Sequence, residues 1–242
     1  MEKCGILRYG EISLRGKNRR MYEDFLENNV RKMLSMHNVT AKIKRYKGRM
    51  VVITNADVSF LKRIFGISSF SLGYRVLRDF KEINKAISEF GSPFPILKFG
   101  DKGKRDEKLI EQIIIGTEGK VFVEIYPDNV FVYDQKEKAV GGLPIGSEGV
   151  VICYIEDEMD ILASLLMMKR GCEVIPFLKN KIDISLFKKY GNYNEPVKYP
   201  NYKDAIAIVS RKKENSILPR LNPLIGINKE KNKELLAYYE SL

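Results

Sequence analysis

The order of short apolar segments near the N-terminus constrains the fold of this chain most. Tyr22, Phe25, Leu26, Val30 and Met33 are spaced by three or four residues, as on the buried face of a helix. The flanking apolar runs are short and bounded by turn residues, as strands are. The expected elements are a strand at 4–9, a helix at 18–36, strands at 42–46 and 50–54, a helix at 58–65 and a strand at 69–77. This order predicts a ferredoxin-like split βαβ unit over residues 1–79.

A second, smaller α/β unit is expected over residues 80–138. Its elements are a helix at 81–90, a strand at 95–99, a helix at 105–115 and a hairpin of strands at 121–126 and 130–133. Residues 139–149 then contain four glycines and a proline. This composition predicts a linker with little capacity to pack.

The last part of the chain, residues 150–242, has the pattern of a parallel sheet. An apolar run at 150–155, a helix at 160–170 and an apolar run at 173–178 form a βαβ unit. A further strand is expected at 205–209, a helix at 229–239 and a loop at 190–200. The predicted fold class is therefore α/β with an α+β N-terminal half, ending in a small Rossmann-like parallel sheet.

Positive charge is concentrated in the first third of the chain. Lys and Arg number 42 against 31 Asp and Glu, and the pI is about 9.4. Residues 1–80 hold 17 basic and 7 acidic residues, residues 81–150 hold 10 and 12, and residues 151–242 hold 15 and 12. The net charge of +11 thus divides into +10, −2 and +3. Such a distribution predicts a polyanionic partner for the N-terminal part.

Three basic clusters are candidate RNA contacts, although a solvated surface run remains the alternative for each. The first precedes and opens the helix at 18–36, where cations oppose the helix dipole and a bound phosphate would offset that cost. The second lies on the hairpin at 42–54, where Tyr46 is available for stacking on a base. The third is a loop before the helix at 105–115. The candidates are Arg15, Lys17, Arg19 and Arg20; Lys44, Arg45, Lys47 and Arg49; and Lys102, Lys104 and Arg105. Arg211, Lys212 and Lys213 are interpreted as a solvated loop.

The cysteines and the hydropathy indicate a soluble protein of the cytoplasm. Cys4, Cys153 and Cys172 are too few and too scattered for a disulfide framework, and no Cys-x-x-Cys pair suggests zinc or redox chemistry. Cys153 lies in an apolar strand and Cys172 at a helix end, so both are expected in the core. No apolar run approaches the roughly 20 residues that a membrane-spanning helix needs.

Five short segments, in the same order, resemble the tRNA 4-thiouridine sulfurtransferase family. They are RYGEISLRGKNR at 8–19, FGISSFS at 65–71, GGLPIG at 141–146, LMMKRG at 166–171 and LNPLIGINKE at 221–230. The resemblance implies a tRNA-binding THUMP domain at 80–138, a joint at 139–149 and a shortened PP-loop ATP pyrophosphatase domain at 150–242. It also implies tRNA as partner, and leaves a homodimer possible because the family's C-terminal domain often self-associates.

The chain departs from that family where ATP would bind. The family's loop reads Ser-Gly-Gly-x-Asp-Ser, whereas the matching positions here contain Glu156, Asp157, Glu158 and Asp160. Glycines allow backbone amides to approach a phosphate closely, and the acidic side chains would repel it. Carboxylates in a loop suit magnesium, but consecutive positions rarely converge on one ion, so no metal site is expected.

The sequence therefore predicts a tRNA-binding protein with no catalytic residues and no cofactor. The family's reactive cysteine has no counterpart after Cys172, which leaves sulfur transfer without its nucleophile. One alternative is a subunit that delivers tRNA to a separate thiolation protein. Another is a nucleotide or metabolite sensor.

Overall fold

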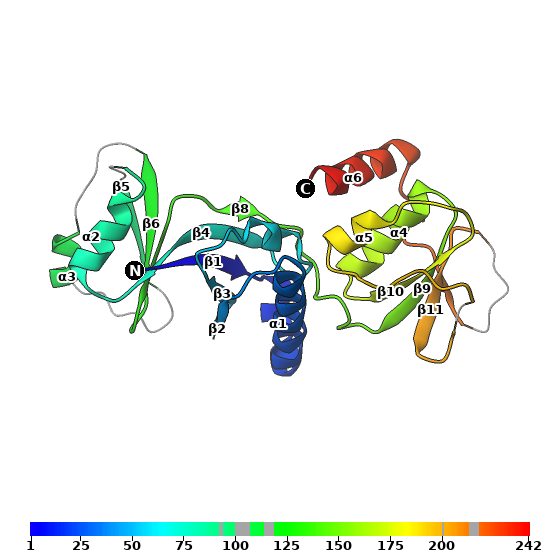
Figure 1. Ribbon diagram of the computed structural model, residues 1–242, viewed down its shortest axis with the longest axis horizontal. Helices are drawn as coiled ribbons and strands as arrows, with labels where there is room; N and C mark the ends of the chain where they lie inside the picture. The colour runs from blue at the N-terminus through cyan, green and yellow to red at the C-terminus, as the bar shows by residue number, and fades with distance from the viewer. Residues whose placement is uncertain (92–93, 100–106, 114–118, 200, 213–217) are drawn as a thin grey trace. The chain divides into compact units, whose positions relative to one another are not determined.

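The computed structural model describes residues 1–91, 94–99, 107–113, 119–199, 201–212 and 218–242 (Figure 1). The chain forms two compact units. The N-terminal unit comprises Met1–Tyr9, Leu34–Lys62 and Ser68–Ala139, and the C-terminal unit comprises Gly10–Met33, Arg63–Ile67 and Val140–Leu242. Among the described residues, no helix is both long and apolar enough to cross a lipid bilayer.

The N-terminal unit is built on an eight-stranded sheet of order β2-β3-β1-β4-β7-β6-β5, with β8 paired to β4. All neighbours are antiparallel except β5 and β6. The order of the four strands β2-β3-β1-β4 is that of a ferredoxin-like unit, so the predicted fold is confirmed, whereas the bounds 1–79 stay a prediction. The strands are β1 (Glu2–Arg8), β2 (Lys42–Tyr46), β3 (Arg49–Ile53), β4 (Ser69–Val76), β5 (Phe94–Phe99), β6 (Lys120–Ile125), β7 (Val130–Tyr133) and β8 (Glu137–Lys138).

The sheet curls, so that strands far apart in its order meet on one face. Tyr46 at the end of β2 lies 6.0 Å from Tyr126 after β6 and 5.3 Å from Phe131 on β7, measured between ring centroids. Residues two apart on a strand share a face, and this face carries the buried side chains of Cys4, Ile6, Val51, Tyr126, Phe131 and Tyr133. The β2–β3 and β6–β7 turns therefore lie close together.

Helices α2 (Phe80–Ser88) and α3 (Glu107–Glu111) belong to the second core of this unit (Figure 1). The carboxylate of Asp79 caps α2 by accepting hydrogen bonds from the amides of Lys81 and Glu82. Ile83, Ala86 and Ile87 on the same helix are buried with the apolar residues of β6 and β7. The helix predicted at 58–65 is a short 3-10 helix, η3 (Ser59–Arg63). Of the helix predicted at 105–115, the structure describes residues 107–113, and α3 is the helical part; residues 105, 106, 114 and 115 lie outside the described residues.

The C-terminal unit contains a four-stranded parallel sheet of order β10-β9-β11-β12. This confirms the predicted βαβ unit and parallel sheet. The strands are β9 (Val150–Ile155), β10 (Glu173–Leu178), β11 (Ala205–Val209) and β12 (Arg220–Leu221). The helices of this unit are α4 (Glu158–Lys169), α5 (Ser185–Lys189), α6 (Lys229–Ser241) and most of α1 (Arg19–Met36), preceded by η1 (Glu11–Leu14) and η2 (Gly16–Asn18).

The glycine-rich segment at 139–149 packs, so the prediction of a linker with little capacity to pack was wrong. Val140, Leu143 and Ile145 are buried. The amide of Leu143 donates to the carbonyl of Lys169 over 2.9 Å. Gly142 has a φ of +79°, and a Cβ there would collide with the end of α4. Gly142 is therefore required by a close approach of the backbone to α4, and not by looseness of the segment.

Candidate functional site

The C-terminal sheet places one candidate site at the carboxyl ends of β9 and β11. The chain leaves β9 for β10 on one side and then returns to β11 on the other side of β9. In doubly wound sheets, ligands bind in the crevice beyond the strand ends at such a switch point. Glu156 follows β9 and Arg211 follows β11, so the acidic loop and the basic loop singled out in the sequence share this position.

The acidic loop caps the N-terminus of α4. Asp157 Oδ1 accepts hydrogen bonds from the amides of Met159 over 2.8 Å and Asp160 over 3.3 Å. Asp160 Oδ2 in turn accepts from the amides of Glu156 over 2.9 Å and Asp157 over 3.3 Å. This reciprocal capping box satisfies the backbone donors that a helix leaves open at its start.

The same carboxylates form ion pairs with the loop after β11. Arg211 Nε donates to Asp160 Oδ1 over 2.6 Å, and Arg211 also pairs with Asp157. Glu156 pairs with Lys212 and, over 3.0 Å, with Lys179 at the end of β10. The hydrogen bonds from Lys212 and Lys179 lower the pKa of Glu156. Those to Asp160 and Asp157 raise the pKa of Arg211.

These contacts correct part of the interpretation of residues 211–213 as a solvated loop, and they revise the argument that the acidic loop repels a phosphate. Arg211 is a partner of the acidic loop and is 28% exposed, so the interpretation of a solvated loop was wrong for this residue. Lys212 pairs with Glu156 but remains exposed, as in a solvated loop, and Lys213 lies outside the described residues. Three cations, Arg211, Lys212 and Lys179, also largely neutralise the acidic side chains. Electrostatic repulsion of a phosphate is therefore not the main effect of these side chains. Glu158 is exposed on the first turn of α4. The stronger obstacle to a phosphate is that the amides of the loop are already bound.

The first basic cluster lies in the C-terminal unit, before and at the start of α1. Arg15 is 3.8 Å from a Glu148 carboxylate oxygen and stacks over the ring of Tyr22, and Tyr22 Oη donates to Glu148 over 2.6 Å. Arg19 pairs with Glu23 one helical turn later over 2.7 Å. Lys17 and Arg20 are exposed and make no ion pair with the described part of the chain. Part of the charge at this helix start is thus offset by the protein itself.

The second basic cluster lies on the β2–β3 hairpin of the N-terminal unit. Arg45 and Lys47 are exposed, and Lys44 is half-buried. Arg49 points into the curled sheet and pairs with the buried Glu124 on β6. Arg49 is therefore held by a protein carboxylate. Lys102, Lys104 and Arg105, the third cluster, lie outside the described residues.

Sequence reasoning missed the buried polar cluster around Glu124. Tyr133 Oη donates to Glu124 over 2.5 Å, and the guanidinium groups of Arg49 and Arg8 lie against the same carboxylate. Arg8 also stacks on the Tyr133 ring at 4.6 Å and donates to Ser71 over 2.9 Å. The alternation of polar and apolar residues on β6 was a possible signal, because it places Glu124 on the same face as Phe122 and Tyr126.

Comparisons with known proteins agree with the resemblance seen in the sequence. Residues 5–71 match the family described as the ThiI ferredoxin-like domain. A probable tRNA sulfurtransferase of Methanocaldococcus jannaschii is 28% identical over 87% of this chain and 68% of its own length. One from Thermococcus kodakarensis is 32% identical over 71% of this chain and 54% of its own. The chain is similar to the tRNA sulfurtransferases over most of its length.

The fold of this chain also occurs in solved structures. PH1313 from Pyrococcus horikoshii superposes with a TM-score of 0.79 at 26% identity, covering 98% of this chain and 99% of that one. A 4-thiouridine synthetase, solved with RNA and bound ATP, has a TM-score of 0.74 at 20% identity, covering 99% and 85%. The chain spans between about half and two thirds of the length of the curated sulfurtransferases that it matches.

The three cysteines of this chain are free and buried, and Cys153 and Cys172 were correctly placed in the core. Burial raises the pKa of Cys4 and of Cys153 to about 12, and it also raises the pKa of Cys172. A thiolate is the reactive form, so none of these groups is an activated nucleophile at neutral pH. Among the described residues, no cluster of His, Cys, Asp and Glu could hold a metal ion.

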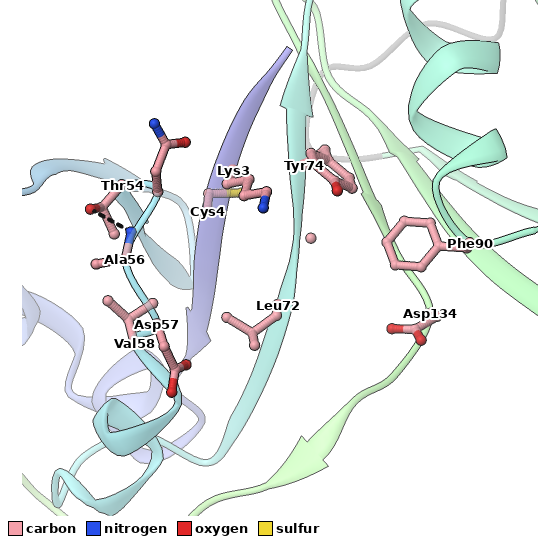
Figure 2. A pocket seen from close by; sticks show the side chains of 12 residues that line it. Lys3, Cys4, Thr54, Ala56, Asp57, Val58, Leu72, Tyr74, Phe90 and Asp134 are labelled. Carbon is pink, nitrogen blue, oxygen red and sulfur yellow. Dashed lines mark hydrogen bonds between the residues drawn. The ribbon is translucent and has the colours of Figure 1, made fainter.

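A cavity of about 340 Å³ in the N-terminal unit was not anticipated from the sequence. Figure 2 shows the loop that carries Val58 on one side, Leu72 of β4 in the middle, and Tyr74 with Phe90 on the other side. Two of its polar side chains are hydrogen-bonded to neighbours: Asp57 accepts from Ser59, and Tyr74 donates to Glu89. Burial raises the pKa of the Cys4 thiol at this cavity, so the thiol is protonated at neutral pH.

Proposed function

We propose that this chain binds tRNA and that it neither cleaves ATP nor transfers sulfur by itself. The tRNA sulfurtransferases act on tRNA by name, and the 4-thiouridine synthetase of the same fold was solved with RNA. The excess positive charge of this chain lies in residues 1–80, which include the matched ThiI ferredoxin-like domain. A polyanion is the partner that such a surface favours.

The proposed lack of ATP cleavage rests on the N-terminus of α4, where the protein's own carboxylates already occupy the backbone amides. A phosphate-binding loop works because backbone amides and the helix dipole face the anion. Here four loop amides already donate to the carboxylates of Asp157 and Asp160, and Arg211 pairs with both. The protein's own carboxylates thus take the place of a phosphate. ATP would have to displace them before it could bind.

Isothermal titration calorimetry with ATP and Mg²⁺ tests this part of the proposal. We expect no binding in the micromolar range and no release of pyrophosphate in a parallel assay. A tRNA sulfurtransferase of full length serves as the positive control under identical conditions. Micromolar ATP affinity of the isolated chain would contradict the occupied-site argument.

Affinity for tRNA across salt concentrations tests the RNA-binding part. For about five phosphate contacts, the slope of log K against log salt is expected to be roughly −4. Reversing two exposed cations, Lys17→Glu with Arg20→Glu, should weaken binding and reduce the steepness of that slope by about two. The matched control is Lys229→Glu with Lys233→Glu on α6, which makes the same change in net charge at exposed positions.

Two results would defeat the RNA-binding proposal. One is tRNA affinity no higher than that for an unrelated acidic polymer such as polyglutamate. The other is an equal loss of affinity for the Lys17/Arg20 and the Lys229/Lys233 variants, since net charge alone would then explain the binding.

A further inference from the structure

The cavity of about 340 Å³ in Figure 2 has the size and the lining of a small-molecule site. Ligand cavities in proteins measure roughly 300–1,000 Å³ and combine apolar walls with a few polar groups. Every residue that lines this cavity belongs to the N-terminal unit, so the cavity lies within one compact unit. Its lining has an apolar part and a charged rim, and each restricts the chemistry of a ligand.

The apolar part of the lining is open to solvent. Leu72 of β4 is 42% exposed, and Val58 lies on one side of it. The half-buried rings of Tyr74 and Phe90 form the other side, with their centroids 5.7 Å apart and their planes at 69°. An apolar group placed between these side chains would remove water from all of them, which favours a ligand with a hydrocarbon body.

Two carboxylates and one ammonium group stand at the rim. Asp57 and Asp134 lie on opposite sides of Leu72 in the view of Figure 2, and Lys3 is on β1. Hydrogen bonds from Ser59 lower the pKa of Asp57, so this carboxylate is ionised at neutral pH. Asp134 and Lys3 are exposed and make no ion pair with the described part of the chain. Two negative charges and one positive charge leave the lining at −1, in a chain whose net charge is +11.

We propose that this cavity binds a small organic monocation with an apolar body, of the alkylammonium or arylalkylammonium class. Phe90 and Asp134 project from the same side of the cavity in Figure 2. The ammonium group of the ligand pairs with the carboxylate of Asp134 and lies against the aromatic ring of Phe90, which attracts cations. The hydrocarbon body covers Leu72 and Val58. An anion of the same size is disfavoured because the carboxylates outnumber the ammonium group, and an inorganic cation would leave the apolar floor in water.

NMR titration of the ¹⁵N-labelled full chain with phenethylammonium tests the site. The amide signals of Leu72, Tyr74 and Asp134 should shift, with a dissociation constant of about 1 mM, as befits a ligand of this size. Phenethyl alcohol and hydrocinnamate keep a similar hydrocarbon body but carry a neutral and an anionic end. Both should bind at least about 5-fold more weakly, because neither can pair with a carboxylate.

Variants of the rim and of the aromatic wall locate the binding. Asp134→Asn should weaken phenethylammonium binding by about 5-fold, the upper value for an ion pair open to solvent. Phe90→Leu should weaken it by about 2- to 5-fold, the effect of a cation–π contact at an exposed site. The matched control is Asp128→Asn, which removes the same charge from an exposed position of the same unit outside this lining and should leave the affinity unchanged. Asp134 is exposed, so its variant tests the site even if Phe90→Leu does not fold.

Three results would overturn the cation site. The first is equally tight binding of phenethyl alcohol or hydrocinnamate, and the second is equal affinity of the Asp134→Asn and Asp128→Asn variants. The third is the absence of shifts at the amides of Leu72, Tyr74 and Asp134 with millimolar phenethylammonium. Each of these results leaves the proposed tRNA binding as it stands, because the cavity was inferred without it.

Discussion

Replacing Arg211 with methionine should destabilise the C-terminal unit by about 2 kcal/mol. Methionine keeps the apolar stem of the side chain but removes the guanidinium that pairs with Asp157 and Asp160. Breaking a buried ion pair costs about 3–5 kcal/mol, and breaking an exposed one costs about 0–1 kcal/mol. The side chain of Asp160 is 8% exposed and that of Arg211 is 28% exposed, which places this pair between the two limits.

Urea denaturation followed by circular dichroism measures this change, since the slope against denaturant reports whether the unfolded state has altered. A double-mutant cycle with Asp160→Asn isolates the coupling between the two side chains. The control is Lys188→Met, whose pair with Glu195 also lies in the C-terminal unit but is 51% and 73% exposed. That variant should change the free energy of unfolding by no more than about 0.5 kcal/mol.

An equal, small effect of Arg211→Met and Lys188→Met would refute the reasoning. It would mean that Asp160 remains satisfied by the loop amides alone and that Arg211 is a surface residue. The occupied switch point would then be much easier to open than the contacts indicate.

Two further predictions concern titratable groups. Burial acts to raise the pKa of Glu124, but Arg49, Tyr133 and Arg8 outweigh burial and lower that pKa. The ionised Glu124 therefore stabilises the fold above the ordinary pKa of a glutamate, and this stabilisation is lost as the pH falls through the pKa in the folded state. The melting temperature of Glu124→Gln should therefore lie below that of the wild type at pH 7, with a gap that narrows below about pH 5; a constant gap would contradict this. Ellman's reagent at pH 8 should find no reactive thiol in the native chain and all 3 thiols after denaturation, because each cysteine is buried; rapid labelling of any native thiol would show that an opening was missed.

The elements that the sequence predicted well are those that depend on local patterns. The spacing of apolar residues from Tyr22 to Met33 and the apolar runs at 150–155 and 173–178 are set by which face of a helix or strand is buried. Such periodicities depend only on residues that are close together in the sequence. The ferredoxin-like strand order followed from them, because few ways exist to pair strands in that succession.

The contacts that the sequence could not predict join residues far apart in the chain. Arg49 meets Glu124, and Arg211 meets Asp157, only because the sheet curls in one case and the strand order reverses in the other. Local composition gave the basic loop near Arg211 the appearance of a solvated surface. Glycines at 141–149 gave a similar false impression of a linker, since a glycine needed for close packing and one needed for flexibility look alike in a sequence.

The stability of the α4 cap and the proposed loss of ATP affinity depend on the same free energy. Freeing the loop amides means breaking the Arg211 contacts, at about 2 kcal/mol, and losing the cap, at about 1 kcal/mol. A protein that is competent to bind only in a state about 3 kcal/mol above its ground state has its apparent affinity reduced by a factor of roughly 150. A ligand with micromolar affinity for the open loop would then bind with a dissociation constant of about 0.2 mM, before any repulsion from the displaced carboxylates. The coupling energy between Arg211 and Asp160 from the double-mutant cycle is therefore a lower bound on the loss of free energy of ATP binding. The coupling energy and this loss must have the same sign.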